Sequence, residues 1–213
     1  MDAVEKVEYK GYVIEIIQDD DGINPRSEWD NLATMICFHN RYTLGDKHTY
    51  RNPDEMIRDL AIEADPYLQD RIEYWEDGKG WAQLQNKFPN TCGEMSDQKI
   101  HKAIQSAIDK HYITLPLYLY DHSGITMSTS PFSCPWDSGQ VGIIYISKKK
   151  ALAEYSWKQL TKSNRAKLIS YLVSEVEVYD QYLTGDVYGF HVHKLDEDGE
   201  IEDEHDKIGR AHV

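Results

Sequence analysis

The sequence predicts an α+β fold with a mainly antiparallel sheet and helices packed on one side of it. Strand patterns occur in runs rather than in alternation with helices, connections between them are short, and no βα unit is repeated. With 213 residues, 40% of them hydrophobic, the chain can bury a substantial core. Neither a linker nor an internal repeat divides the sequence, so we expect a single α+β domain over residues 1–206.

The first expected element is a strand, since side chains alternate in character over residues 7–18. It ends in the acidic turn of residues 19–22. Residues 23–31 are expected to form an irregular loop, because Pro25 favours extended geometry in the preceding residue and the polar side chains compete for backbone hydrogen bonds. A second strand is expected over residues 32–39.

Helices are expected next. Asn52 is a typical N-cap, followed by Pro53 at the first helical position and by acidic residues in the first turn. Pro66 breaks this helix, and another is expected to run to about Trp75. Apolar residues at helical spacing then predict a helix over residues 96–110.

The second half of the chain begins with β-forming runs and ends with one more strand. The predicted strands are residues 112–120, 125–128, 140–147 and 187–195. Ser147 is expected to cap a short helix over residues 148–157, and a longer helix is expected over residues 163–182, with Gly185 as its stop. A hairpin turn is expected at residues 196–199.

Charge and composition exclude several classes of protein. The chain has a net charge of −14, and eight of its carboxylates lie in residues 196–206. The sequence contains no basic stripe that could release counterions from a nucleic acid. We therefore expect no direct binding to nucleic acid. The apolar runs are much shorter than the roughly 20 residues of a membrane helix, and the acidic start does not resemble a signal peptide. We expect a cytoplasmic protein that does not bind membranes.

Three polar and aromatic clusters stand at the ends of predicted elements, where binding residues concentrate. Trp lies beside Asp in two of them, and an indole wall would raise the pKa of a neighbouring carboxyl. The candidate catalytic residues are Asp121, His122 and Asp137. The candidate ligand-binding residues are Trp29, Asp30, His39, Arg41, Trp136, Tyr179, Asp180 and Asp186. The alternative is structural, since Asp and Asn commonly close turns and Trp commonly packs.

No cofactor is predicted, apart from a candidate site for a divalent metal. His191 and His193 are two apart on a predicted strand, so they share a face and could ligate one ion. His39 or His122, together with a carboxylate, could complete the set. The alternative is that such His pairs simply stand on an exposed strand. The chain contains no GxSxG, GxGxxG or GxxxxGK motif, so neither a serine nucleophile elbow nor a phosphate loop is indicated.

Three stretches resemble a family of uncharacterised proteins of phages and mobile elements: YKGYVIEIIQDDDGINPRSEWDNLATMICFHNRYTLGD, YLYDHSGITMSTSPFSCPWDSGQVGIIYISK and EVYDQYLTGDVYGF. The resemblance implies a small accessory protein in the cytoplasm of the bacterial host, and it supplies no reaction. We therefore predict binding to a host or viral partner, with interference with host defence as its purpose. The alternatives are a small hydrolase or nucleotide-modifying enzyme, or a protein that sequesters a small nucleotide, with a pocket lined by Trp, Asp and His.

Residues 207–213, KIGRAHV, follow the acidic run without periodicity and match a translated sequencing-adapter stretch. We interpret them as read-through that is not native, and the chain also departs from the phage family after Phe190. This interpretation leaves them out of the predicted fold.

Overall fold

A computed structural model describes residues 3–76, 92–196, 199–201 and 209–212 of the chain. These residues form six helices and two antiparallel sheets, which confirms the α+β class. Two sheets are found where the sequence predicted one. The chain folds as two compact units: unit 1 contains Met1–Asn31, Leu117–Val141 and Tyr171–Val213, and unit 2 contains Leu32–Pro116 and Gly142–Ser170. The expectation of a single domain over residues 1–206 stays a prediction.

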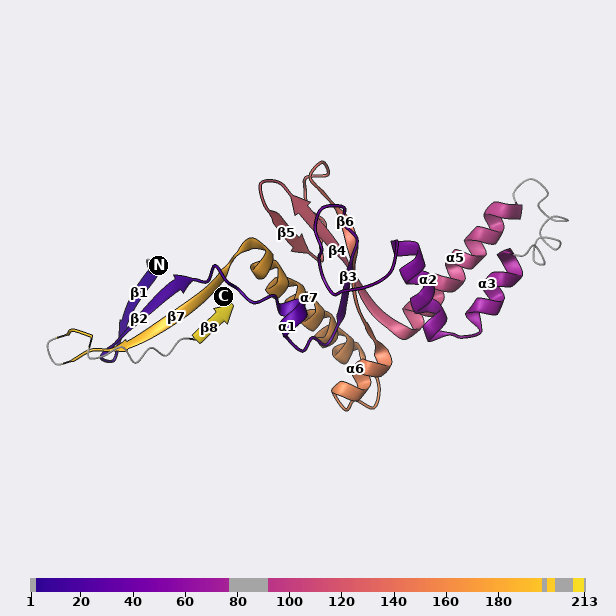
Figure 1. Cartoon of the computed structure of the whole chain (residues 1–213). Coiled ribbons are helices and arrows are strands. Elements are labelled where there is room, and N and C mark those ends of the chain that lie inside the picture. The colour runs from indigo at the N-terminus through magenta and orange to yellow at the C-terminus, as the bar shows by residue number, and fades with distance from the viewer. Residues whose placement is uncertain (1–2, 77–91, 197–198, 202–208, 213) are drawn as a thin grey trace. The chain divides into compact units, whose positions relative to one another are not determined.

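Sheet 1 belongs to unit 1 and has the strand order β1-β2-β7-β8 (Figure 1). Its strands are β1 (Glu5–Tyr9), β2 (Tyr12–Gln18), β7 (Val187–Lys194) and β8 (Gly209–His212). The prediction of one strand over residues 7–18 was wrong, because Lys10 and Gly11 have φ values of 50° and 78° and turn the chain back on itself. Positive φ at both central residues is the geometry of a tight hairpin turn, and Gly supplies it without strain.

The segment after β2 is also more regular than expected. Pro25–Glu28 forms the short helix α1, and the side chain of Asn24 accepts a hydrogen bond of 2.9 Å from the backbone of Arg26. The extended geometry that Pro25 imposes on Asn24 is also what an N-cap requires. The prediction of an irregular loop here was therefore wrong.

Helix α7 (Lys162–Thr184) carries two contacts that organise unit 1. The guanidinium of Arg26 donates to Glu175 over 2.8 Å, and both side chains are almost fully buried. Asp180 accepts hydrogen bonds of 2.8 Å from the Thr126 hydroxyl and 2.6 Å from the Met127 amide. Helix α7 is thereby tied to α1 and to a strand of sheet 2.

Sheet 2 has the strand order β3-β6-β4-β5. Its strands are β3 (Thr34–Cys37), β6 (Ser138–Ser147), β4 (Tyr112–Asp121) and β5 (Ile125–Ser128). In β6 and β3, Gly142 lies opposite Cys37. The ranges of β4 and β6 continue from one unit into the other.

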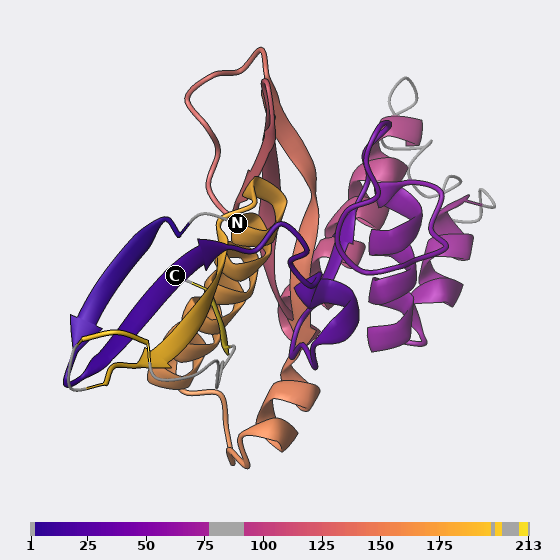
Figure 2. The same ribbon diagram turned by 60° about the vertical axis from the view of Figure 1, so that its left-hand side comes forward.

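Unit 2 contains the helices α2 (Pro53–Ala64), α3 (Leu68–Glu76), α5 (Cys92–His111) and α6 (Lys148–Glu154). Of these, α2, α3 and α5 pack together (Figure 2). Met56, Leu60 and Ile72 are among the side chains that form their core. The expected caps are confirmed: the side chain of Asn52 accepts from the Glu55 amide over 2.8 Å, and the Ser147 hydroxyl accepts from the Lys150 amide over 3.1 Å.

The expected helix stop also forms, whereas residues 197 and 198 of the expected hairpin turn lie outside the described residues. Gly185 has a φ of 74°, which is the left-handed conformation that ends many helices. Leu195 forms a bridge to Ile201, and Gly199 has a φ of 83°. Strand β8 covers part of the segment that we interpret as adapter read-through, and residues 207, 208 and 213 lie outside the described residues. That interpretation stays a prediction.

Candidate metal centre

Strands β2 and β7 place one carboxylate beside two imidazoles. In their antiparallel register Glu15 lies directly opposite His191, and His193 lies opposite Val13. Opposite residues share a face of the sheet, and so do residues two apart on one strand. The three side chains therefore project from the same face of sheet 1.

The potential ligand atoms of this group lie close to one another. One ligand atom each from Glu15, His191 and His193 lies within 4.8 Å of the other two. Nε2 of His193 is 3.7 Å from Oε2 of Glu15, and His193 is only 8% exposed. Zinc binds imidazole nitrogen and carboxylate oxygen at about 2.0–2.2 Å in a tetrahedron, so two of its ligand atoms lie about 3.3–3.6 Å apart. The 3.7 Å between the Glu15 and His193 atoms is close to this value, and His191 completes the group within 4.8 Å.

Lys6 on β1 holds the carboxylate of this group. Lys6 lies opposite Glu15 in the register of β1 and β2, and its Nζ is 2.5 Å from Oε1 of Glu15. This hydrogen bond lowers the pKa of the Glu15 carboxyl, and the neighbouring His193 and His191 act in the same direction. Glu15 is therefore ionised at neutral pH, and its second oxygen, Oε2, faces His193.

The donor set decides which ions fit. Two imidazole nitrogens and one carboxylate oxygen suit first-row transition metals such as Zn²⁺, whereas Mg²⁺ and Ca²⁺ prefer oxygen ligands alone. Three protein ligands leave a fourth tetrahedral position for water or an outside donor. The described part of the chain thus contains a Glu/His/His group whose chemistry matches a zinc-type site.

The sequence indicated two members of this group and missed the third. His191 and His193 do share a face, as the spacing of two predicted. Neither His39 nor His122 belongs to the group, and the carboxylate comes from Glu15 on β2. No local pattern distinguishes Glu15 from any other polar residue of a strand, because its position depends on the long-range register of β2 and β7.

The three candidate catalytic residues come together at the base of the connection between β5 and β6. Nδ1 of His122 is 3.6 Å from Oδ2 of Asp137, and the Asp121 amide donates to the Asp137 carbonyl over 2.8 Å. Cys134, which is not among the candidate site residues, contacts the same Asp137 oxygen through its Sγ at 3.5 Å. The Trp136 side chain is 92% exposed, so it does not shield these groups from water.

Several of the candidate ligand-binding residues have structural contacts in unit 1. Tyr179 is only 2% exposed and stacks on Tyr182, so it packs in the core. Asp180 joins α7 to β5, as described above. A hydrogen bond from the Tyr188 hydroxyl to the Asp186 carboxylate raises the pKa of Tyr188. Their role in ligand binding stays a prediction.

The remaining candidates are divided between the two units. Trp29, which is 45% exposed, and Asp30, which is also exposed, follow α1 in unit 1. His39 and Arg41 belong to unit 2, where Nδ1 of His39 accepts from the Arg41 amide over 3.3 Å. His39 also lines a pocket of about 420 Å³ formed by the end of β3 and the residues that follow it. Trp29 and Asp30 thus do not belong to the same unit as His39 and Arg41.

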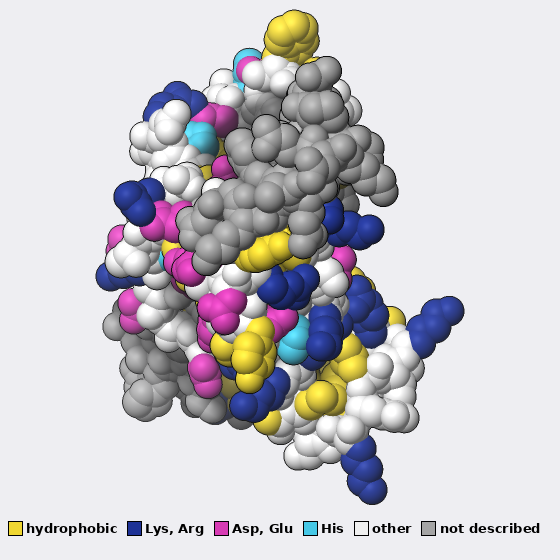
Figure 3. Space-filling view, turned by 90° about the vertical axis from the view of Figure 1, so that its right-hand side faces the viewer, with side chains coloured by type: hydrophobic (Ala, Val, Ile, Leu, Met, Phe, Trp, Pro, Cys, Tyr) yellow, Lys and Arg dark blue, Asp and Glu magenta, His cyan; other side chains and the backbone are white. Residues whose placement is uncertain are grey.

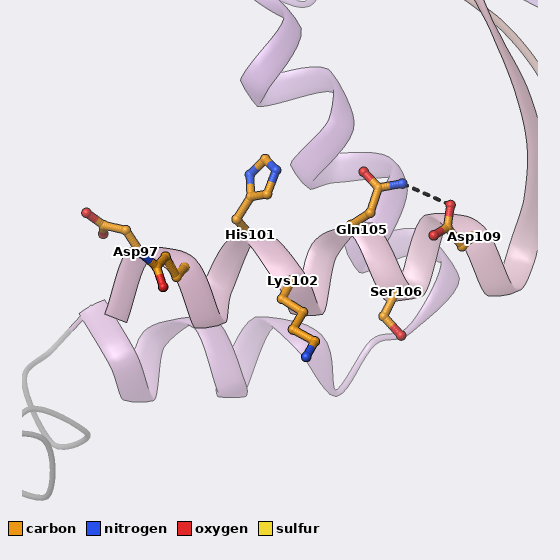
Figure 4. A pocket seen from close by; sticks show the side chains of 7 residues that line it. Asp97, His101, Lys102, Gln105, Ser106 and Asp109 are labelled. Atoms are coloured by element: carbon orange, nitrogen blue, oxygen red, sulfur yellow. Dashed lines mark hydrogen bonds between the residues drawn. The ribbon is translucent and has the colours of Figure 1, made fainter. Parts of the chain in front are cut away.

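Two hollows, of about 740 and 360 Å³, lie on the helices of unit 2. The larger, of about 740 Å³, is lined by α5 alone, and Figure 4 shows that His101 and Gln105 project from a different side of the helix than Lys102 and Ser106. Figure 3 views the molecule from the side where α3 and α5 lie in Figure 1, and Lys and Arg side chains there stand among carboxylates and apolar side chains. In the described part of the chain, neither hollow brings three potential metal-ligand atoms within 4.8 Å of one another, as Glu15, His191 and His193 do.

Comparison with protein-family models, curated proteins and solved structures finds no match. Among the described residues, no helix is both long and apolar enough to pass through a bilayer. The chemistry of the candidate metal centre is therefore inferred from its geometry alone.

Proposed function

We propose that the protein binds one first-row transition-metal ion, with Zn²⁺ as the best fit, through Glu15, His191 and His193. The observation that carries the proposal is the meeting of these three potential ligand atoms within 4.8 Å on one sheet face. Ligands supplied by strands are held in position by the sheet register, which makes such a site more precise than one carried on loops. The ion joins β2 to β7 and occupies a site with one coordination position open to water or an outside donor.

The environment of Glu15 supports this proposal. Ligating carboxylates and imidazoles commonly have outer hydrogen-bond partners that fix their orientation. Lys6 bonds to Oε1 of Glu15, which leaves Oε2 directed toward His193 and free to coordinate an ion. The competing arrangement is a His193–Glu15 ion pair without metal, and it forms only when the imidazole is protonated.

Metal titration of the chelator-treated protein tests the proposal. We expect isothermal titration calorimetry with ZnCl₂ to give one ion per chain. Replacing His193 with Gln removes a ligand, so the affinity should fall by about a hundredfold or more, since loss of an outer partner alone costs 10–100-fold. Zn²⁺ at about 100 times its Kd should also stabilise the wild-type fold by about 2.7 kcal/mol.

His39→Gln is the matched control, because it removes an imidazole that the sequence proposed as a ligand and that lies in unit 2. This variant should bind Zn²⁺ like the wild type. Equal affinities for the wild type and His193→Gln, or a stoichiometry unrelated to one ion per chain, would contradict the proposed site.

A second candidate function is partner binding, which the loop around Trp136 favours. An indole that is 92% exposed is an unusual surface feature, and Trp is enriched among residues that dominate binding energy at interfaces. The loop is held in shape by the bonds of Asp137 described above and by the Ser138 hydroxyl, which donates to the Cys134 carbonyl over 2.5 Å. The resemblance to phage proteins supports the same role, an accessory protein that binds a host or viral partner. The enzymatic and nucleotide-sequestering alternatives remain predictions.

Affinity capture from phage-infected bacteria, followed by binding measurements with the purified candidate, tests this role. We expect Trp136→Ala to weaken binding at least tenfold, because loss of a central aromatic anchor typically costs about 2 kcal/mol or more. Tyr67→Ala is the control, since Tyr67 is 78% exposed and belongs to unit 2. If Trp136→Ala binds the partner as tightly as Tyr67→Ala does, the loop is not the interface.

A further inference from the structure

We propose that two copies of this chain pair through β1, in an antiparallel register centred on Val7. Strand β1 is an edge of sheet 1, and all five of its residues are exposed. An edge strand presents unpaired backbone groups to any second strand that can match it. This inference goes beyond the proposed metal site and does not depend on it.

Two of the exposed side chains of β1 are hydrophobic, although edge strands that face water are commonly protected by charged side chains. Val7 is 40% and Tyr9 is 57% exposed, and they lie opposite Ile14 and Tyr12 of β2. These side chains share one face of the sheet, while Lys6 and Glu8 project from the other face. A second copy added at the edge would extend both faces without interruption.

The charges of β1 select the register. In a two-fold symmetric antiparallel pair, directly opposite residues share a face, so the axis must pass beside one residue of the strand. With the axis beside Val7, Lys6 lies opposite Glu8 of the second copy, and the same pair repeats on the other side of the axis. With the axis beside Lys6 or Glu8, two like charges lie opposite each other, which is unfavourable.

The groups that would form the two ion pairs are suited to this role. Lys6 is 64% exposed although its Nζ contacts Glu15, and an ammonium group has three donors, so it can reach a second carboxylate. Glu8 has no ion-pair partner within the part of the chain that the structure describes. The remaining opposite pairs, Val7 with Val7 and Glu5 with Tyr9, carry no charge conflict.

Sedimentation equilibrium of the full chain over a range of concentrations tests the pairing, both in EDTA and with Zn²⁺. We expect the wild type to reach twice the chain mass of 24.7 kDa in both conditions. Glu8→Lys places two lysines opposite each other on both sides of the axis, so self-association should weaken about tenfold or more. Glu5→Lys makes the same change of charge on the same strand but opposite Tyr9, so it should still dimerise.

A mixture provides the sharpest comparison. Lys6→Glu alone should also lose self-association, whereas an equimolar mixture of Lys6→Glu and Glu8→Lys should form mixed dimers, because their opposite charges match again. A wild type that stays monomeric, equal effects of Glu5→Lys and Glu8→Lys, or a mixture of folded variants without mixed dimers would overturn the proposal. If Lys6→Glu does not fold, the comparison of Glu5→Lys with Glu8→Lys decides. Dimerisation in EDTA without zinc binding would refute the metal site alone.

Discussion

Replacing Arg26 with methionine should lower the free energy of unfolding by about 3–5 kcal/mol, because it leaves the Glu175 carboxylate buried without its cation. The side chains of Arg26 and Glu175 are only 1% and 9% exposed, and their charged atoms are 2.8 Å apart. A buried charge that loses its partner retains the cost of desolvation but not the attraction that offset it. Urea denaturation followed by circular dichroism measures the change.

The double variant Arg26→Met/Glu175→Leu should recover most of the lost stability, since two apolar side chains of similar volume replace two buried charges. Arg51→Met is the control for loss of an arginine from an ion pair, because Arg51 is 84% exposed in its pair with Glu55. It should change stability little. If Arg26→Met behaves like Arg51→Met, the buried pair does not stabilise the fold as we infer.

Replacing Gly142 with alanine should destabilise the protein by about 3 kcal/mol, the upper end of the usual cost of overpacking. A Cβ at Gly142 would lie only 1.9 Å from the carbonyl oxygen of Ile36 and 2.9 Å from the Cα of Cys37. These are backbone atoms of the neighbouring strand, so no side-chain rotation can relieve the contact. Strands β3 and β6 would have to separate locally.

Gly139→Ala is the matched control, since Gly139 lies on the same strand and a Cβ there meets no atom within 4 Å. Thermal unfolding of the two variants should separate them clearly, with a lower Tm for Gly142→Ala alone. Equal melting temperatures would show that the pairing of β3 with β6 tolerates the added methyl group.

Local signals in the sequence predicted much of the secondary structure. Two helices are capped at their N-termini by Asn52 and Ser147, and one ends at Gly185. These roles depend on contacts within a few residues, so they could be inferred without tertiary information. The turn at Lys10 and Gly11 was missed, because Gly11 is its one local signal and an isolated Gly also occurs within strands. Because the predicted strand included Lys10 and Gly11, the prediction contained neither the β1–β2 hairpin nor a second sheet.

The candidate site was predictable only in part, for a related reason. The spacing of His191 and His193 gives their shared face from strand geometry alone. Glu15 joins them through pairing with a strand near the other end of the chain, and nothing nearby in the sequence specifies that register. The candidate catalytic residues could be found from local signals, because His122 and Asp137 stand at the ends of predicted elements, and the structure brings them to 3.6 Å.

The long sequence separation within sheet 1 has a consequence for synthesis on the ribosome. The Gln18 side chain at the end of β2 bonds to the Gly185 carbonyl just before β7, 167 residues later in the chain. At translation rates of about 5–20 residues per second, the emerging β1-β2 hairpin waits on the order of ten to thirty seconds for its third strand. During that interval its apolar residues are exposed to chaperones and to other nascent chains, so slower elongation should increase aggregation during expression.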